Sequence, residues 1–392
     1  MSEYNKLSRE ELIALCRERK IKGYSAKKKA ELIALLQTPV STEVQKEKIQ
    51  RLNYIGSKFQ LLEWLTSNIQ EKTGLNSFKN TKVADLFSGT GIVSYHFRTL
   101  GASIISNDAE LFSSIITSAF TNSVYNDICA NLIQTLNNEL ETGRKVGFVT
   151  EKYSPYDSER KFFTEENAQK IDYIRNRIEE FHSELSQDNY TFLLASLLVS
   201  ADAVSNVPAV YGCFLKNFKD KAKKPLTLIP VHTCSNLPKE STTYNLDVLS
   251  DDLLKKVEAD IVYLDPPYNN RQYSKNYFPL NIIAKTPKQL EKEPELKGKT
   301  GIPTDCFISP FCKTEKAVEK AFETLFKSLK TKWIFLSYNS ESILSKNRMC
   351  EIMEKYGDVS VVERDYKRFK SFEYNEDKDI KEYLFCLKIW QQ

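Results

Sequence analysis

The sequence predicts an α/β fold with a mostly parallel sheet, because short apolar segments alternate with helical segments from residue 51 onward. Two segments contribute most to this prediction. Residues 82–101 read as a strand, a turn with two glycines and a helix. Residues 261–264 form a continuous apolar run that stops at the D-P-P-Y segment 265–268. Ligands of open α/β sheets bind beyond the carboxyl ends of the strands, so both turns are candidate binding segments.

The remaining strands are read from apolar runs bounded by turn residues. Helix-sized connections between them favour parallel pairing, because a parallel pair needs a long crossover. We expect the last two strands to be antiparallel to each other. In chain order, the strand-bearing segments are 82–101, 102–110, 242–254, 259–268, 333–340, 359–366 and 382–389.

The stretch 111–240 interrupts this alternation with helical segments and a basic, aromatic-rich part. It is too long to be a simple crossover between two core strands. We therefore predict that 111–240 is an insertion that forms a domain of its own, or most of one, and that 51–110 and 241–392 together form the main domain.

Residues 7–36 stand apart as two short helices joined by a turn. Ser8 precedes Glu11 by three residues, which is the pattern of a capping box. The segment resembles the SAP module, a small helical DNA-binding unit, and this resemblance predicts a DNA-binding module over 1–40. A helical extension packed on the main domain is the alternative. Residues 38–42 read as a linker.

Composition limits the class of protein. Of the 392 residues 41% are hydrophobic and 28% charged, which is ordinary for a globular protein. No apolar run reaches the roughly 18 residues of a membrane span, and the first residues lack a signal-peptide pattern, so we expect a cytoplasmic, nucleoid-associated protein. The eight cysteines form no C-x-x-C pair and the three histidines are far apart. We expect reduced thiols and no metal.

The net charge is only +4, but basic residues cluster. Such clusters suit contacts with phosphates, although a solvated protein face explains each cluster equally well. The first cluster is Lys27, Lys28 and Lys29, and the second is Lys216, Lys219, Lys221, Lys223 and Lys224.

The glycine turn 85–91 reads D-L-F-S-G-T-G and favours S-adenosylmethionine over a dinucleotide. It lacks a third glycine for a pyrophosphate turn, and Asp85 would repel a diphosphate but suit a sulfonium and an amino group. Asp108 ends the next strand and is placed to accept from ribose hydroxyls. Asp247 ends the strand before 261–264 and is placed to meet the adenine amine. The alternative for each acid is capping of the following helix.

The D-P-P-Y segment suits methyl transfer to an exocyclic amine. Two prolines cannot donate to a ladder, so the chain leaves the sheet with free carbonyls beside a carboxylate and an aromatic ring. Acceptors of this kind can hold an NH2 group, and the ring can stack on a base. A proline-terminated strand with an incidental Asp is the alternative.

These motifs together resemble the Dam-type, or alpha-class, DNA adenine-N6 methyltransferases, in particular those of FokI-type restriction–modification systems. The likeness covers about residues 51–390. It includes R-L-N-Y-I-G-S-K at 51–58, the glycine turn, and the segments 206–216 and 269–284. Phe278 stands where the family often has His.

The resemblance implies a Rossmann-like S-adenosylmethionine-dependent methyltransferase sheet whose insertion recognises the target. It implies that Tyr54 and Lys58 hold the methionine end of the cofactor. Asp85, Phe87 and Gly89 would lie beside them, Asp108 at the ribose and Asp247 at the adenine.

The expected reaction is direct transfer to adenine N6 of a base flipped out of double-stranded DNA. Asp265 and the Pro266 carbonyl would accept the N6 hydrogens, with Pro267 shaping the turn and Tyr268 stacking on the base. Residues expected to contact the displaced base or phosphates are Arg271, Tyr273, Asn276, Tyr277, Lys216, Lys219, Lys223 and Lys224.

We expect a monomer or weak dimer, with a cognate restriction endonuclease as a candidate partner. Two other functions stay open at this point. One is an N4-cytosine DNA or RNA amino-methyltransferase of the same fold, and the other is a non-catalytic DNA-binding protein.

Overall fold

The chain divides into two compact units, Met1–Ile49 and Gln50–Gln392. In this computed structural model, the described residues are 8–18, 28–29, 32, 52, 54–231, 233, 241–292, 294–366 and 380–390.

The first unit contains helix α1 (Arg9–Glu18). The predicted capping box is confirmed at its start: the Ser8 N–H donates to Glu11 Oε2 at 2.7 Å, and the Glu11 N–H donates to Ser8 Oγ at 3.2 Å. Leu12 and Leu32 are buried. Lys28 and Lys29 are exposed. Lys27, most of the predicted second helix and the linker 38–42 lie outside the described residues, so the SAP-like role stays a prediction.

The second unit is built on a seven-stranded sheet in the order β3-β2-β1-β4-β7-β9-β8. Its five strands from β3 to β7 are parallel, and β9 is antiparallel to both of its neighbours. The mostly parallel α/β sheet and the antiparallel last pair are therefore confirmed. The strands are β1 (Lys82–Asp85), β2 (Ser103–Asn107), β3 (Ser241–Tyr244), β4 (Ile261–Leu264), β7 (Trp333–Asn339), β8 (Gly357–Tyr366) and β9 (Ile380–Ile389).

The strand order reverses next to β1. From β1 the chain adds β2 and β3 on one side, and it then returns to place β4 and β7 on the other. In register, Ala84 lies opposite Ile105 of β2 and Val262 of β4. Such a reversal opens a crevice beyond the carboxyl ends of the central strands, which is where open α/β sheets bind ligands.

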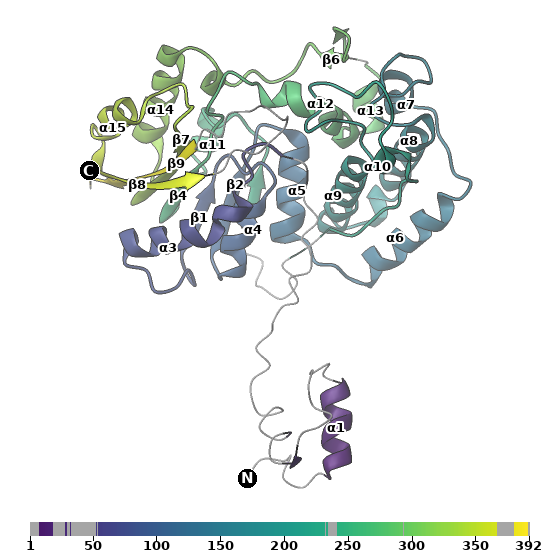
Figure 1. Cartoon of the computed structure of the whole chain (residues 1–392), viewed down its shortest axis with the longest axis horizontal. Coiled ribbons are helices and arrows are strands. Elements are labelled where there is room, and N and C mark those ends of the chain that lie inside the picture. Colours follow the sequence, from purple (N-terminus) through teal and green to yellow (C-terminus); the bar gives the residue numbers. More distant parts are fainter. Residues whose placement is uncertain are drawn as a thin grey trace. The chain divides into compact units, whose positions relative to one another are not determined.

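Helices cover both faces of the sheet. Figure 1 shows α3 and α4 on one side of the strands and α14 and α15 on the other. On the second side, apolar residues of the strands pack with α11, α14 and α15 in one buried cluster. These helices are α3 (Leu62–Thr73), α4 (Ile92–Thr99), α11 (Asp251–Leu254), α14 (Glu315–Ser328) and α15 (Lys346–Met353).

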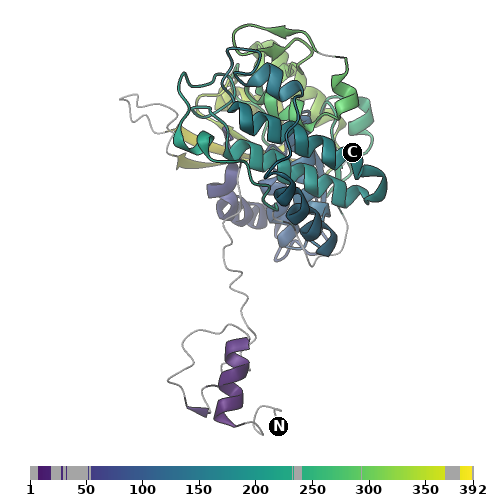
Figure 2. The same cartoon turned by 90° about the vertical axis from the view of Figure 1, so that its right-hand side faces the viewer.

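A group of helices lies beside the sheet, mostly from the predicted insertion (Figures 1 and 2). Helix α9 (Gln187–Ala203) is its centre, because all residues from 189 to 202 are buried. Helix α5 (Leu111–Asn122) contacts both α9 and the strands β2 and β3, so it joins the group to the sheet. The others are α6 (Asp127–Glu139), α7 (Phe148–Tyr153), α8 (Glu165–Glu180), α10 (Asp220–Lys223), α12 (Tyr273–Ala284) and α13 (Pro287–Leu290).

Short elements complete the unit. They are the hairpin β5 (Leu296–Lys297) and β6 (Ile302–Pro303), and the 3-10 turns η2 (Lys58–Leu61), η3 (His182–Glu184) and η4 (Pro310–Cys312). No helix in the described part of the chain is long and apolar enough to span a membrane.

Candidate active site

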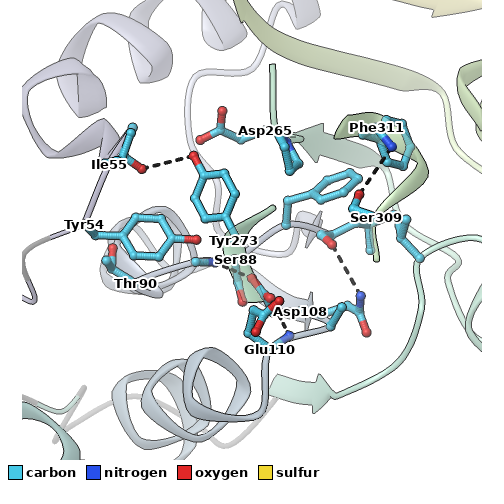
Figure 3. A pocket seen from close by; sticks show the side chains of 18 of the residues that line it. Tyr54, Ile55, Ser88, Thr90, Asp108, Glu110, Asp265, Tyr273, Ser309 and Phe311 are labelled. Carbon is cyan, nitrogen blue, oxygen red and sulfur yellow. Dashed lines mark hydrogen bonds between the residues drawn. The ribbon is translucent and has the colours of Figure 1, made fainter. Parts of the chain in front are cut away.

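A hollow opens beyond the carboxyl ends of β1, β2 and β4, at the reversal of strand order (Figure 3). Its empty volume, including the solvent space at its mouth, is ≈ 920 Å³. Four carboxyl groups and several aromatic rings line it, and its one lysine is ion-paired. The lining includes Tyr54, Lys58, Phe87, Gly89, Asp108, Glu110, Asp247, Asp265, Pro267, Tyr268, Tyr273, Phe307 and Phe311.

The glycine turn wraps one wall of this hollow. Gly89 has a φ of +52°, and a Cβ there would lie 3.0 Å from the Tyr54 ring. Gly91 has a φ of +75°, and its Cβ would lie 2.9 Å from the Thr117 Cα in helix α5. Only glycine accepts such backbone angles at so little steric cost. The turn therefore depends on glycine both for its shape and for its close packing under Tyr54.

Asp108 holds this turn in place. Its Oδ2 accepts the Gly89 N–H at 2.7 Å, and its Oδ1 accepts the Glu110 N–H at 2.9 Å. Burial raises the pKa of the Asp108 carboxyl to about 7. The carboxylate thus caps backbone groups and also lines the hollow, so capping and cofactor contact are compatible here. Each oxygen keeps a lone pair that can accept a ribose hydroxyl.

Asp247 also lines the hollow, but it does not end a strand. Strand β3 stops at Tyr244, and Asp247 begins the next turn, where its Oδ1 accepts the Leu249 N–H at 3.0 Å. The predicted strand position is corrected by three residues, because the N-L-D segment turns away from the ladder. The expected contact with adenine stays a prediction.

Asp85 lies beneath the hollow, outside the lining residues. Ser94 donates to its Oδ2 at 2.7 Å, whereas its buried Oδ1 has no hydrogen-bond partner within the described residues. Burial raises the pKa of this carboxyl to about 7. An unpartnered buried carboxylate oxygen under the glycine turn is compatible with a positively charged ligand above it.

The D-P-P-Y segment ends strand β4, as predicted. Strand β4 ends at Leu264, and residues 265–268 leave the sheet beside the hollow. The Asp265 side chain is 20% exposed, and only its Oδ1 is paired within the described residues, with Lys58. Tyr268 lines the hollow, while its carbonyl accepts the Ile343 N–H at 2.9 Å and fixes the segment. Asp265 Oδ2 is therefore left to accept a hydrogen from a ligand.

The Lys58 ammonium is surrounded by acceptors of the protein itself. Its Nζ lies 2.8 Å from Asp265 Oδ1 and 3.4 Å from Glu382 Oε1, and it donates to the Gly56 carbonyl at 3.1 Å. The ammonium is thus held by one hydrogen bond to the backbone and by ion pairs with two carboxylates. Burial opposes the charge on Lys58, but the two carboxylates hold its pKa well above the usual range. Lys58 still lines the hollow, so the expectation that it helps hold the methionine end of the cofactor stays a prediction.

Tyr277 does not line the hollow. It is fully buried, and its hydroxyl accepts the Ile55 N–H at 2.9 Å. Tyr273 donates to the Ile55 carbonyl at 3.3 Å, so the two tyrosines of α12 hold both backbone polar groups of Ile55 (Figure 3 shows the Tyr273 bond). Tyr54 stacks on Tyr277 with 4.8 Å between ring centroids. The predicted DNA contact of Tyr277 is corrected to a supporting role, because a buried ring cannot meet DNA, whereas Tyr273 remains at the hollow.

The other predicted DNA contacts are scattered over the surface. The exposed residues are Arg271, Lys216, Lys223 and Lys224. Asn276 is half-buried, and its backbone carbonyl accepts the Tyr211 N–H. Lys219 instead donates its ammonium hydrogen to the Val207 carbonyl, and burial lowers its pKa. A lysine held in this way has fewer hydrogens left for a phosphate.

Several lining or supporting residues carry no signal in the sequence. Asn107 bonds to both the N–H and the carbonyl of Leu246, which ties β2 to the chain after β3. Gln272 exchanges two hydrogen bonds with the Ser309 backbone at 2.8 and 3.1 Å, which fixes the wall that carries Phe311. No local pattern indicates these side chains, because each depends on a partner far along the chain.

Glu110 and Glu382 are two further buried acids that the sequence-based prediction missed. Glu110 accepts from the Asn281 amide at 2.5 Å, so it links the start of α5 to α12. Glu382 did leave a signal: in the alternation of β9 it shares a face with Leu384 and Cys386, which are both buried. An acid on the core face of a strand is a candidate functional group.

Comparison with known proteins agrees with this geometry. Residues 54–352 match the family described as D12 class N6 adenine-specific DNA methyltransferase. The chain belongs to this family. The type II methyltransferase M.CviAII of Paramecium bursaria Chlorella virus 1 is 40% identical over 346 residues, covering 88% of this chain and 100% of that protein.

Two bacterial relatives give the same result. The type II methyltransferase M.NlaIII of Neisseria lactamica is 38% identical over 325 residues, covering 82% of this chain and 93% of that protein. The type II methyltransferase M.FokI of Planomicrobium okeanokoites is 35% identical over 354 residues, covering 86% of this chain and 52% of that protein. The predicted resemblance is thus confirmed, and family membership decides for adenine N6 in DNA over the alternatives left open above.

S-adenosylmethionine supplies the methyl group in this family, and the hollow fits it. The cofactor carries an adenine, a ribose and two cationic centres. Correspondingly, the lining offers aromatic rings and unpaired carboxylate oxygens, while its one lysine is already occupied. Asp108 and the glycine turn would hold it, with the unpartnered Asp85 oxygen beneath.

Proposed function

We propose that this methyltransferase modifies adenine at a specific sequence of double-stranded DNA, and that the target base leaves the helix to enter the hollow beside Asp265. The observation that carries the proposal is that Asp265 Oδ2 is unpaired within the described residues, and that Asp265 lines the same hollow as the glycine turn. A base stacked inside a duplex could not reach a carboxylate in the wall of a hollow, so flipping is required, at a cost of a few kcal/mol.

In this proposal each residue of the D-P-P-Y segment has one task. Asp265 Oδ2 and the Pro266 carbonyl accept the two N6 hydrogens, which exposes the nitrogen lone pair towards the methyl donor. No described residue donates a hydrogen bond to the Pro266 carbonyl, so that acceptor is available. Tyr268 lines the hollow and stacks on the base. The gain comes mainly from placement of two reactants in line.

The exposed lysines at 216, 223 and 224 and Arg271 are proposed to contact phosphates, which position DNA without reading its sequence. The insertion 111–240 is proposed to read base edges. The names of the relatives point to restriction–modification, so we propose that the chain protects cytoplasmic DNA against a cognate endonuclease, as a monomer or weak dimer.

Transfer of labelled methyl groups from S-adenosylmethionine to DNA, followed by nucleoside analysis and sequencing of modified bases, tests this function. N6-methyladenine at one recurrent sequence is expected. Asp265→Ala should lower the single-turnover rate by at least about 100-fold, since one preorganised electrostatic group contributes roughly 3 kcal/mol to a barrier. It should still bind the cofactor.

Asp260→Ala is the matched control. Asp260 directly precedes strand β4 and accepts the Lys82 N–H at 3.0 Å, so it lies at the opposite end of the strand from Asp265. It should methylate DNA at the parent rate. Turnover of Asp265→Ala within tenfold of the parent would remove Asp265 from the mechanism, and methyl groups scattered without a recurrent sequence would exclude site-specific modification.

A further inference from the structure

A buried charge cluster joins the catalytic segment to the last strand of the sheet. Lys58 lies between Asp265 and Glu382, at 2.8 and 3.4 Å, so the two carboxylates are no more than about 6 Å apart. Glu382 is 5% exposed, and its Oε1 has no hydrogen-bond partner within the described residues. Two negative groups sharing one cation leave the cluster with a net negative charge.

The reaction makes a specific demand on this cluster. When the bond between N6 and the methyl carbon forms, the carbon–sulfur bond breaks and its electron pair stays on sulfur. The nitrogen then holds one proton too many, and this proton must leave to an acceptor. Asp265 is the carboxylate in place to receive it and pass it to water, so its rate contribution depends on its basicity.

Lys58 by itself would weaken Asp265. An ammonium 2.8 Å away fixes the carboxylate but also stabilises its ionised form, which makes it a poorer proton acceptor. Glu382 offsets this effect, because it pairs with the same ammonium without lining the hollow and adds a second negative charge. This arrangement buries the Glu382 carboxylate, and burial raises the pKa of Glu382 to about 7.

We propose that Glu382 is a positioning residue for methyl transfer, which balances the Lys58 charge so that Asp265 is held in place and still accepts the N6 proton. This role rests on the proposed function of Asp265. The partner is supplied by β9, which reaches the site because β9 pairs directly with β7, the neighbour of β4.

Other titratable groups face the cluster and are part of its electrostatics. The Tyr263 hydroxyl of β4 is bonded to Ser337 of β7 at 2.8 Å. The remaining groups are Asp85 at the end of β1, Tyr268 in the catalytic segment, and Tyr273 of α12. None of the tyrosines ionises near neutral pH, because burial raises the pKa of each above its usual value.

Glu382→Gln separates charge from shape, because glutamine has nearly the same size and keeps an oxygen beside Lys58 without the negative charge. Single-turnover methylation would be measured from about pH 5.5 to 9 with saturating DNA and cofactor. The acid limb of the profile should move to lower pH by about one unit, since removing a like charge at such a distance lowers the Asp265 pKa by that order. The plateau rate should fall roughly threefold to tenfold, the Brønsted consequence of a weaker base.

Three further variants make the test specific. Glu382→Asp keeps the negative charge, so the acid limb of its pH–rate profile should lie at the same pH as in the parent. Lys58→Gln removes the cation and should move the limb to higher pH, the opposite direction. Glu363→Gln is the matched control: Glu363 lies in the neighbouring strand β8, opposite Tyr383, and pairs with Lys346 and Lys381 on the surface. It should leave the profile unchanged.

Each outcome either supports or overturns the proposal. A lower plateau with an unmoved acid limb in Glu382→Gln would mean that the residue only supports the fold, and the proposal would fall. If that variant does not fold, an unmoved limb in Lys58→Gln would overturn it equally. If Asp265→Ala is inactive and Glu382→Gln behaves as the parent, this inference fails while the proposed function stands. A parent protein that methylates no adenine would overturn both.

Discussion

Replacing Asp108 tests how the cofactor turn is held. In Asp108→Ala the N–H groups of Gly89 and Glu110 lose their acceptors, at 2.7 and 2.9 Å. A buried donor left without a partner costs about 1–3 kcal/mol, and relief of a buried carboxylate returns part of this. We expect a loss of roughly 2–4 kcal/mol in the unfolding free energy of the cofactor-free protein.

Cofactor binding should weaken as well. A hydrogen bond to a charged group contributes about 1.5–3 kcal/mol, so loss of the expected ribose contact predicts a roughly 10- to 150-fold rise in the Kd of S-adenosylmethionine. Titration calorimetry measures this Kd, and thermal denaturation measures the stability in parallel. Affinity for DNA without cofactor should barely change. The Kd of the Asp108→Asn variant should lie between those of the parent and the alanine variant, because the asparagine amide keeps one acceptor oxygen.

Asp260→Ala serves as the control here too, since it removes a carboxylate that accepts a backbone N–H at the other end of the central strands. It should lower stability without changing the cofactor Kd. If Asp108→Ala lowered the melting temperature yet bound S-adenosylmethionine within twofold of the parent, Asp108 would be a cap alone and the cofactor assignment would be refuted.

The same structure predicts three further effects. Gly91→Ala should abolish cofactor binding or stable folding, because its φ of +75° and the 2.9 Å approach to Thr117 leave no room for a Cβ; full solubility with parent affinity would contradict this. Asp85 and Asp108 have folded pKa values of about 7, above the ordinary value, so their contribution to stability is present below about pH 4 and is lost as the pH rises to 7. Chemical denaturation of the cofactor-free protein should show that the unfolding free energy falls as the pH rises over this range. The fall should be smaller in Asp108→Ala. Deleting residues 1–45 should leave the methylated sequence unchanged but weaken DNA binding, with a log–log salt slope shallower by about 0.9 for each phosphate that the segment neutralises; an unchanged slope in binding titrations would remove the DNA-binding role of this segment.

Local sequence was sufficient for the elements that meet at the site. The run 261–264 reads as a buried strand because it is apolar throughout, and two prolines end it at the same residue in the structure. The glycine turn and Asp108 were placed correctly, because a strand, a tight turn and a strand-end acid are all encoded within a few residues. Alternation and turn chemistry act over this short range, so they can be read without knowing the fold.

Tertiary structure alone decided what each of these side chains faces. Lys58 pairs with Asp265 and Glu382 because the strand order brings β4 and β9 to either side of β7, an order that no short segment encodes. Tyr277 is buried, although Tyr273 one turn earlier in α12 lines the hollow, because Tyr277 packs into the core of the helical group. Periodicity tells which residues share a face, but the partner of that face depends on contacts between residues far apart in the chain, and these are set by the packing of the whole unit.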